Sequence, residues 1–127
     1  MDKVVHFEIT FDDHQRAKDF YGSVFEWELT DNDMGGVTYT TVTTVPIDEK
    51  MMPKEPGAIN GGIMKRSSEA PTHVITIGVD SIDDSLKKVD AGGGTTITPR
   101  TPVPGVGAFA YFKDSEGNVM GLWEREV

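Results

Sequence analysis

The stretches Asn60-Gly61-Gly62-Ile63-Met64-Lys65-Arg66 and Val119-Met120-Gly121-Leu122-Trp123-Glu124-Arg125 carry the same pattern, although they lie far apart in the chain. In each, a glycine is followed by an aliphatic residue and, four places on, by an arginine. The alternation of side chains predicts a strand, with Gly62 and Gly121 at matching inward-facing positions. The pattern therefore indicates that the chain contains two copies of one structural unit.

Both halves also begin alike, with a strand that carries a histidine. His6-Phe7-Glu8-Ile9 opens the first half, and His73-Val74-Ile75-Thr76 opens the second. Side chains alternate between the two faces of a strand, so His6 and Glu8 share one face while Phe7 and Ile9 share the other. We expect Phe7 and Ile9 to pack against a helix, and His6 and Glu8 to face away from it.

A helical pattern follows each of these strands. Asp12 with Gln15, and Ser81 with Asp84, have the spacing of a capping box at a helix N-terminus. Apolar residues recur at helical spacing after both caps and predict a buried stripe on each helix. The stripes are Ala17, Phe20, Tyr21, Val24 and Phe25 in the first helix, and Ile82, Leu86 and Val89 in the second. The glycines at 92–94 end the second helix.

Three further strands complete each half. We expect them at residues 27–30, 37–45 and 58–66, and again at 95–98, 108–113 and 118–124. Turns are expected at 31–36 and 114–117, and proline-rich loops at 46–56 and 99–107. Each half therefore predicts the order βαβββ.

The fold class that follows is α+β, in a single domain spanning residues 1–127. Its two βαβββ modules, at 1–66 and 72–127, are joined by a polar linker, and each is marginal in size for stability alone. We expect them to form one eight-stranded, strongly curved mixed sheet. Because helices cover only one face of such a sheet, the other face forms a concave ligand-binding cup.

The composition excludes several kinds of partner. The formal net charge of −9 disfavours nucleic acid and anionic membranes, whose recognition needs clustered Lys and Arg. No apolar run approaches the ~20 residues of a membrane span, and the N-terminus lacks the apolar stretch of a signal peptide. There is no cysteine, so neither a disulfide nor a thiolate metal site is expected. We expect a cytoplasmic protein with a small-molecule ligand, no nucleic acid partner and no membrane partner.

The ordered set of elements resembles the vicinal oxygen chelate superfamily, which includes glyoxalase I, bleomycin-resistance proteins and extradiol dioxygenases. Five stretches carry the resemblance: His6-Phe7-Glu8-Ile9, Arg16-Ala17-Lys18-Asp19-Phe20-Tyr21, Val24-Phe25-Glu26-Trp27, Val79-Asp80-Ser81-Ile82-Asp83 and Phe112-Lys113-Asp114-Ser115-Glu116-Gly117-Asn118. The last resembles the family's hairpin F-x-D-P-E-G-N, with Ser115 in place of the proline. Within the superfamily the chain is most similar to small, little-characterised proteins related to lactoylglutathione lyase. The resemblance also implies a homodimer, because family members often close their cups by dimerisation.

The resemblance implies where a metal ion would bind. In the family's metal enzymes, the ligands come from the first and last strands of each half. His6 matches a first-strand ligand, but the last-strand positions fall on Gly62 and Gly121, which offer no side-chain donor. The first-strand position of the second half falls on Val74, and only a β-bulge would turn His73 into the cup. We therefore expect no metal ion and no other cofactor.

A reduced metal site is the alternative. Glu8 shares a face with His6, and together with His73 these residues would form a two-His, one-carboxylate set for Zn, Ni, Mn or Fe. The protein would then be a divalent-metal-dependent lyase, isomerase or dioxygenase with Glu8 as the base. Glyoxalase I activity itself is disfavoured, because its usual carboxylates are missing. His14 and Glu124 are assigned no part in the site.

Without a metal ion, the cup is expected to be an apolar pocket with polar anchors. Met64 and Trp123 lie two residues beyond Gly62 and Gly121, so their side chains point into the same cup. The two glycines are expected to leave open space on its floor. The favoured function is binding of an unidentified small molecule, as in glyoxalase-like and bleomycin-resistance proteins. The predicted ligand-binding residues are His6, Glu8, Gly62, Met64, Gly121 and Trp123, and whether the protein is an enzyme, and with which catalytic residues, stays open.

Overall fold

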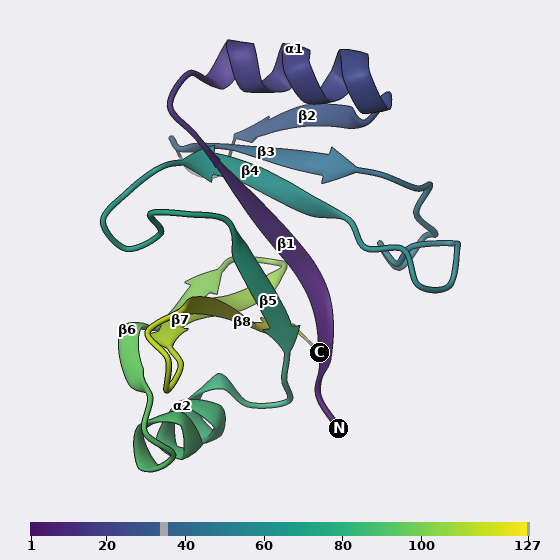
Figure 1. Cartoon of the computed structure of the whole chain (residues 1–127). Helices are drawn as coiled ribbons and strands as arrows, with labels where there is room; N and C mark the ends of the chain where they lie inside the picture. Colours follow the sequence, from purple (N-terminus) through teal and green to yellow (C-terminus); the bar gives the residue numbers. More distant parts are fainter. Residues whose placement is uncertain (34–35, 127) are drawn as a thin grey trace. The chain divides into compact units, whose positions relative to one another are not determined.

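The computed structural model describes residues 1–33 and 36–126, and this part of the chain forms eight strands and two helices (Figure 1). In chain order they are β1 (Lys3–Phe11), α1 (His14–Phe25), β2 (Glu28–Asp33), β3 (Thr38–Thr43), β4 (Gly61–Lys65), β5 (Val74–Gly78), α2 (Ile82–Ala91), β6 (Thr95–Val103), β7 (Gly107–Lys113) and β8 (Val119–Arg125). The predicted order βαβββ is confirmed in both halves. The α+β class with an eight-stranded mixed sheet is confirmed as well.

The strands lie in the order β2-β3-β4-β1-β5-β8-β7-β6. β1 pairs with β4 in parallel, and β5 pairs with β8 in parallel. The pairs β2–β3, β3–β4, β6–β7 and β7–β8 are antiparallel. The same pairing therefore occurs in both halves, as a duplication requires.

The chain divides into two compact units. The N-terminal unit comprises His6–Ser67 and Pro71–His73, and it contains α1, β2, β3, β4 and most of β1. The C-terminal unit comprises Val74–Val127 with Met1–Val5 and Ser68–Ala70, and it contains α2 and β5 to β8. In the described part of the chain, neither helix is long and apolar enough to cross a membrane.

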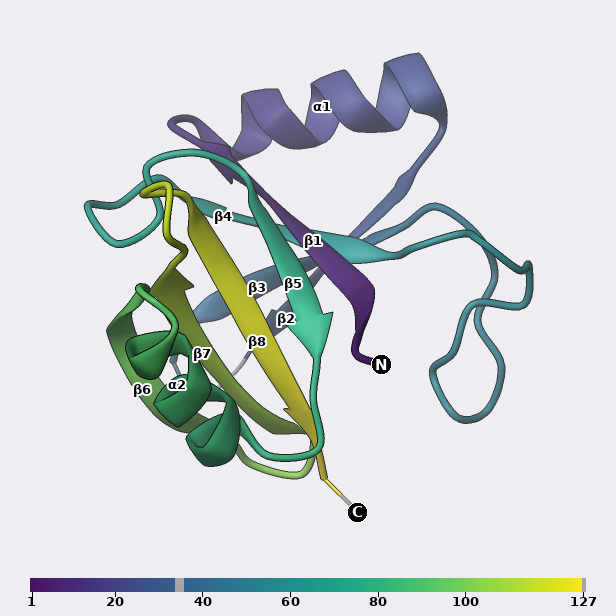
Figure 2. The same cartoon turned by 60° about the horizontal axis from the view of Figure 1, so that its bottom comes forward.

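The C-terminal unit has a filled core under α2, which lies against β6, β7 and β8 (Figure 2). Ile82 and Leu86 of α2 are exposed by only 0% and 7%, and they join Ala108, Ala110, Phe112 and Leu122 in one hydrophobic cluster. The Ser81 side chain accepts the Asp84 N–H and caps the helix, and Gly92 closes its other end. The predicted cap, apolar stripe and glycine stop of this helix are confirmed.

The helix of the N-terminal unit is attached differently. None of the residues of α1 is buried, and Phe20, Val24 and Phe25 are exposed by 53%, 55% and 53%. The prediction of a buried stripe is therefore wrong for α1. Its main apolar attachment is Tyr21, whose ring stacks on Trp27 with centroids 5.2 Å apart and 4° between the ring planes.

A polar cluster provides the second attachment of α1. The Nε2 atom of His14 lies 2.8 Å from the hydroxyl of Thr40 on β3, and this hydroxyl donates to the Oδ1 atom of Asp31 on β2 at 2.7 Å. Lys18, one turn after His14, donates to the other oxygen of Asp31 at 2.9 Å. The bonds from Lys18 and Thr40 hold the pKa of Asp31 below its usual value. His14 therefore has a structural contact that the sequence did not predict.

The start of α1 differs from the prediction by one residue. Asp13 is the N-cap, because its carboxylate accepts the Arg16 N–H at 2.9 Å. Asp12, which was predicted as the cap, instead pairs with Arg66 at 2.9 Å. The two adjacent aspartates offer the same chemistry, so only the backbone conformation decides between them.

Two strands, β2 and β6, run three or more residues further than predicted. β2 continues to Asp33 within the turn predicted at 31–36, of which residues 34–35 lie outside the described part of the chain. β6 continues to Val103, through Pro99 and Pro102, where a loop was predicted. Proline is tolerated there because β6 is an edge strand and its register with β7 is irregular between Thr96 and Thr101.

Candidate functional site

Each unit has one sheet face that its helix does not cover. In the N-terminal unit, Phe7 of β1 contacts Trp27, which stacks on Tyr21 of α1, so Phe7 lies on the helix side. His6 and Glu8 are its neighbours on the strand and therefore point to the opposite face. The candidate site of this unit is built on that uncovered face.

His6 is held by Tyr39 of β3, a residue that the sequence analysis did not single out. The Nε2 atom of His6 lies 3.0 Å from the Tyr39 hydroxyl. Burial of the imidazole lowers the pKa of His6 to about 4, so the ring is neutral at pH 7. A neutral imidazole carries one donor and one acceptor nitrogen, and the tautomer decides which of the two groups donates. In either case the pair is uncharged.

The Tyr39 ring also explains why residue 62 is glycine. Gly62 is buried, and it is the register partner of Glu8 on β1 and of Thr41 on β3. A Cβ atom at Gly62 would collide with the Tyr39 hydroxyl and would lie 2.5 Å from the ring carbon that bears it. The open space predicted above Gly62 is therefore absent, because Tyr39 fills it. The resemblance implied a metal ligand at this last-strand position, but the space beside Gly62 is occupied by the phenol of Tyr39.

Glu8 and Met64 lie on the same uncovered face. Glu8 is the register partner of Gly62, and Thr10 is the register partner of Met64. Both Glu8 and Met64 are half-buried. The face thus combines an uncharged hydrogen-bonding pair, a carboxylate and a thioether from three neighbouring strands.

In the C-terminal unit, Gly121 has a comparable position with different neighbours. It is buried and is the register partner of Thr76 on β5 and of Tyr111 on β7. A Cβ atom at Gly121 would lie 2.6 Å from the Thr76 hydroxyl oxygen and 3.3 Å from Val74 Cγ1. The open space predicted here is also absent. The Thr76 hydroxyl is buried and has no hydrogen-bond partner within residues 1–33 and 36–126.

Trp123 lies two residues beyond Gly121 on the same strand and shares its face. It is half-buried, and its register partner on β7 is Phe109. The indole lies over Gly107, where a Cβ atom would be 2.9 Å from Trp123 Cζ2. The Phe109 ring lies 5.6 Å from that of the buried Tyr111, so this face of β7 and β8 carries three aromatic residues, of which Phe109 and Trp123 are half-buried.

His73, part of the alternative metal set, is exposed and lies directly before β5. Val74 is buried and, together with Thr76, would contact a side chain at position 121. From Thr76 to Gly78, β5 and β8 pair without a bulge. When no bulge is present, the alignment with the family predicts this orientation, in which Val74 and not His73 shares the face of Gly121.

The donors present do not fit the metal site of the family. Gly62 and Gly121 supply no ligand, Val74 supplies none, and the Nε2 atom of His6 is engaged by Tyr39. Among the described residues, no group of three or more His, Asp and Glu side chains is placed to hold a metal ion.

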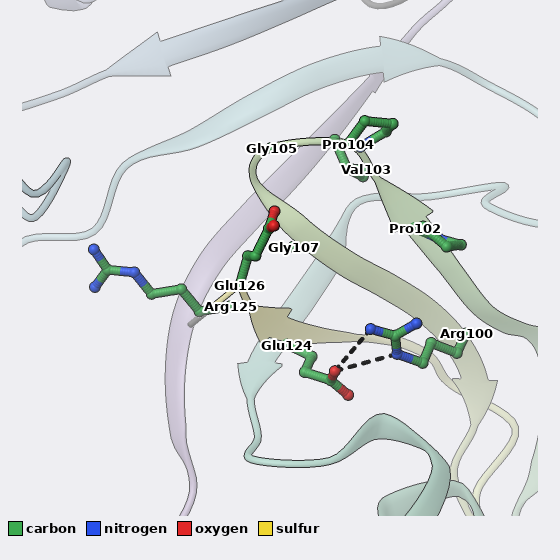
Figure 3. A pocket seen from close by; sticks show the side chains of 9 residues that line it. All are labelled: Arg100, Pro102, Val103, Pro104, Gly105, Gly107, Glu124, Arg125 and Glu126. Carbon is green, nitrogen blue, oxygen red and sulfur yellow. Dashed lines mark hydrogen bonds and ion pairs between the residues drawn. The ribbon is translucent and has the colours of Figure 1, made fainter.

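A separate polar arrangement fixes α2 in the C-terminal unit (Figure 3). The Glu124 carboxylate accepts the Ile82 N–H at 2.8 Å and two N–H groups of Arg100 at 3.2 and 2.9 Å. The bonds from Arg100 and Ile82 hold the pKa of Glu124 below its usual value. A cavity of about 270 Å³ lies beside this ion pair, and the side chain of Arg125 points away from the Glu124–Arg100 pair in Figure 3. Because Glu124 and Arg100 neutralise each other, we assign the arrangement a structural role.

Two βαβββ units with matching strand pairing, each with polar and aromatic residues on its uncovered face, define the class of glyoxalase-like proteins. The chain belongs to the Glyoxalase/Bleomycin resistance protein/Dioxygenase superfamily, whose sequence profile matches residues 3–122. The resemblance inferred from the sequence is confirmed.

Similar curated proteins carry glyoxylase names. The chain is 31% identical over 115 residues to the candidate glyoxylase CFP32 of Mycobacterium bovis and Mycobacterium tuberculosis. That match covers 88% of this chain but 41% of CFP32, so the chain spans less than half the length of this relative. It is 26% identical over 121 residues to a glyoxylase-like domain-containing protein of Didymella fabae, covering 93% of this chain and 90% of that protein.

Solved structures share the fold at low sequence identity. A hypothetical protein from Bacillus halodurans is 18% identical with a TM-score of 0.68, and the match covers 99% of this chain and 96% of that one. Methylmalonyl-CoA epimerase from Streptomyces coelicolor, solved with 2-nitronate-propionyl-CoA, is 14% identical with a TM-score of 0.67, covering 98% of both chains. At these identities the likeness concerns the fold alone.

Proposed function

We propose that the protein binds a small molecule on the uncovered sheet faces and does so without a metal ion. The observation that carries the proposal is the hydrogen bond between His6 and Tyr39 above Gly62. It puts an uncharged donor and acceptor pair where the family's metal enzymes would carry ligands. Small-molecule sites are built in this way, from a few convergent polar groups on an otherwise apolar surface.

The charge of the chain favours a neutral or cationic ligand. The formal net charge is −9, and Glu8 lies on the same face as His6. In the C-terminal unit, the half-buried Trp123 and Phe109 offer ring faces on which an aromatic or cationic group can stack. The proposed ligand-binding residues are therefore His6, Glu8 and Met64 with Tyr39, and Trp123 beside Gly121.

A metal-dependent lyase, isomerase or dioxygenase is the second candidate. The names of the relatives, glyoxylases, favour it, and His6 and Glu8 do share one face. It would need a further donor from a residue such as His73, which is exposed. The metal-free proposal requires no such rearrangement.

We also propose that the protein is located in the cytoplasm.

Protein-observed NMR with a library of neutral and cationic aromatic fragments tests the proposal. We expect bound fragments to shift the amide signals around His6, Gly62 and Gly121. Replacing Tyr39 by Phe removes one hydrogen-bonding group and should weaken the bound fragments roughly 3- to 10-fold. The matched control is Tyr21→Phe on the helix side, which should leave the affinity unchanged. Fragments that shift only signals of α1 or α2, or that bind Tyr39→Phe as well as the wild type, would contradict the proposal.

A further inference from the structure

A hollow beside α1, which we call the α1 hollow, is separate from the proposed ligand site. Its volume is about 290 Å³, close to the lower end of the range for small-molecule sites. It is bounded by the last two residues of β1, by the two aspartates that follow them, by Arg66 after β4, and by four residues of α1. Phe11, the last residue of β1, stacks on His14 of α1. The hollow therefore lies on the helix side of the N-terminal unit, and His6 lies on the other side.

Aromatic rings form the apolar part of the α1 hollow. Phe11, Phe20 and Tyr21 line it, and each of these rings is held by another ring. Phe11 stacks on His14 with centroids 5.0 Å apart. Phe20 meets Tyr21 edge-on at 5.1 Å, and Tyr21 stacks on Trp27 at 5.2 Å. Rings that are already fixed lose little conformational entropy when a ligand binds, and an aromatic ligand can pack against them in an offset or edge-on arrangement.

Arg16 brings an unpaired positive charge to the α1 hollow. Its backbone N–H donates to the cap residue Asp13 at 2.9 Å. Its guanidinium makes no hydrogen bond or ion pair with residues 1–33 and 36–126. A guanidinium is a planar fork of N–H donors that matches the two oxygens of a carboxylate. An acceptor in the hollow can therefore bond to Arg16 without breaking an existing contact.

Arg66 offers a second donor, whose direction is already fixed. Its Nε atom donates to the Asp12 carboxylate at 2.9 Å, and its Nη1 atom donates to the Pro71 carbonyl at 2.7 Å. These two bonds hold the plane of the guanidinium. They leave the Nη2 atom without a partner in the described part of the chain. The hollow thus combines one unpaired arginine with one that is oriented and only partly satisfied.

The charges of the lining select among anions. Arg16 and Arg66 are balanced by Asp12 and Asp13, so the lining is neutral in sum, although the chain has a formal net charge of −9. A phosphate dianion would bring two negative charges close to both aspartates. A carboxylate brings only one, and its two oxygens match the arginine fork. Because the remaining walls are aromatic, the anion that fits is a carboxylate attached to a ring.

We propose that the α1 hollow binds a small aromatic carboxylic acid. The carboxylate accepts hydrogen bonds from the Arg16 guanidinium and from Nη2 of Arg66, and the ring of the ligand lies against Phe20 and Tyr21. This ligand differs in charge from the neutral or cationic one proposed for the uncovered sheet faces, so the two sites can be tested separately. A one-ring acid with this single charged group should bind with a Kd on the order of 1 mM.

Protein-observed NMR with benzoate as the probe tests the proposal. Benzoate should shift the amide signals of Phe11, Ala17 and Arg66 in a saturable way. Benzamide has the same ring without the charge and should bind about 10-fold more weakly. Inorganic phosphate at equal ionic strength should not displace benzoate. The absence of saturable shifts at the hollow, equal affinity for benzamide, or displacement by phosphate would each overturn the proposal.

Variants of exposed residues separate the charged contact from the ring contact. Arg16→Gln should weaken benzoate about 10-fold and leave benzamide unchanged. The matched control is Arg125→Gln, which makes the same change at an exposed arginine outside the hollow and should bind benzoate like the wild type. Phe20→Ala should weaken both probes alike, because it removes one ring. Wild-type affinity in Arg16→Gln, or an equal loss in the two arginine variants, would overturn the proposal.

Discussion

The two helices of this protein follow equivalent strands, but they are attached to their units by different forces. α2 buries Ile82 and Leu86 in a continuous hydrophobic cluster. α1 buries none of its residues and is held by the stack of Tyr21 on Trp27 and by the polar cluster around Asp31. The comparison teaches that a duplicated fold can keep its strand pairing while the packing of its helices diverges, which leaves one helix face free for another role.

The two glycines of the repeated pattern, Gly62 and Gly121, also have different neighbours in the two units, on the sheet face away from the helices. Both are buried, and neither has room for a Cβ atom. Beside Gly62 the neighbour is Tyr39, which bonds His6, whereas beside Gly121 the neighbours are Thr76 and Val74. The N-terminal unit therefore has the polar pair His6 and Tyr39 at this position. The C-terminal unit has the buried and tightly packed side chains of Thr76 and Val74 there.

The largest difference between the units should appear when apolar side chains are removed from their helices. Leu86→Ala in α2 should lower the free energy of unfolding by about 2–5 kcal/mol, because it leaves a cavity in the core. Val24→Ala in α1 should change it by roughly 0.5 kcal/mol or less, because the side chain is exposed. Urea unfolding followed by circular dichroism measures both. Equal losses would contradict the contrast between the two helices.

The glycine contrast can be tested with a double-mutant cycle. Gly62→Ala should cost about 1–3 kcal/mol, because the new Cβ meets the Tyr39 ring. In a Tyr39→Ala background the same change should cost much less, since the collision is gone. Gly121→Ala should be costly in both backgrounds, because its neighbours are Thr76 and Val74. If Tyr39→Ala does not reduce the cost of Gly62→Ala, the assigned contact is wrong.

The sequence predicted the order of the elements and the packing of α2 well, because both depend on local signals. The capping box at Ser81, the apolar stripe and the glycine stop all agree for α2. For α1 the stripe Phe20, Val24 and Phe25 has the right spacing, but periodicity gives only the direction of a side chain and not whether anything covers it. The exposure of α1 is a property of its partners and could not be read from the helix alone.

The directions of the candidate side chains were predicted in part. Alternation correctly placed His6 and Glu8 on the face away from Phe7, and parity correctly placed Glu124 on the opposite face from Gly121, where it accepts the Ile82 N–H. Tyr39 was missed, because its contact with His6 joins residues 33 positions apart on strands separated by β4. The sequence did contain an indication of this contact. A tyrosine on a strand next to one that contains an inward-facing glycine, as Tyr39 is to Gly62, can fill the space that the glycine leaves.

The pH dependence of stability should reveal the polar site of the N-terminal unit. Burial lowers the pKa of His6 from 6.5 to about 4, so the unfolded chain binds the proton more readily between these values. Stability should therefore fall as pH drops from 6.5 to 4, by up to about 1.4 kcal/mol per pH unit from this group. His6→Gln should flatten the profile in this window. Parallel profiles for the two proteins in urea unfolding would show that His6 titrates normally.

The smallest effects are expected from the carboxylates that fix the two helices. Asp31→Asn weakens the bond from Lys18, so hydrogen exchange of the α1 amides should quicken with little change in global stability. Glu124→Gln keeps an oxygen that can accept the Ile82 N–H, so exchange in α2 should change less. Faster exchange in α2 than in α1 would contradict the view that α1 depends on its polar cluster.

Elemental analysis of purified protein, with and without prior exposure to Ni, Zn, Mn or Fe ions, tests the central claim most directly. The claim is that Tyr39, Gly62 and Gly121 stand where the family's metal enzymes carry ligands, and that His6, which burial keeps neutral, is bonded to Tyr39. The account predicts no stoichiometric metal in the wild type and no difference in His6→Ala. One equivalent of any of these ions per chain, lost in His6→Ala, would contradict it and favour the metal-dependent enzyme.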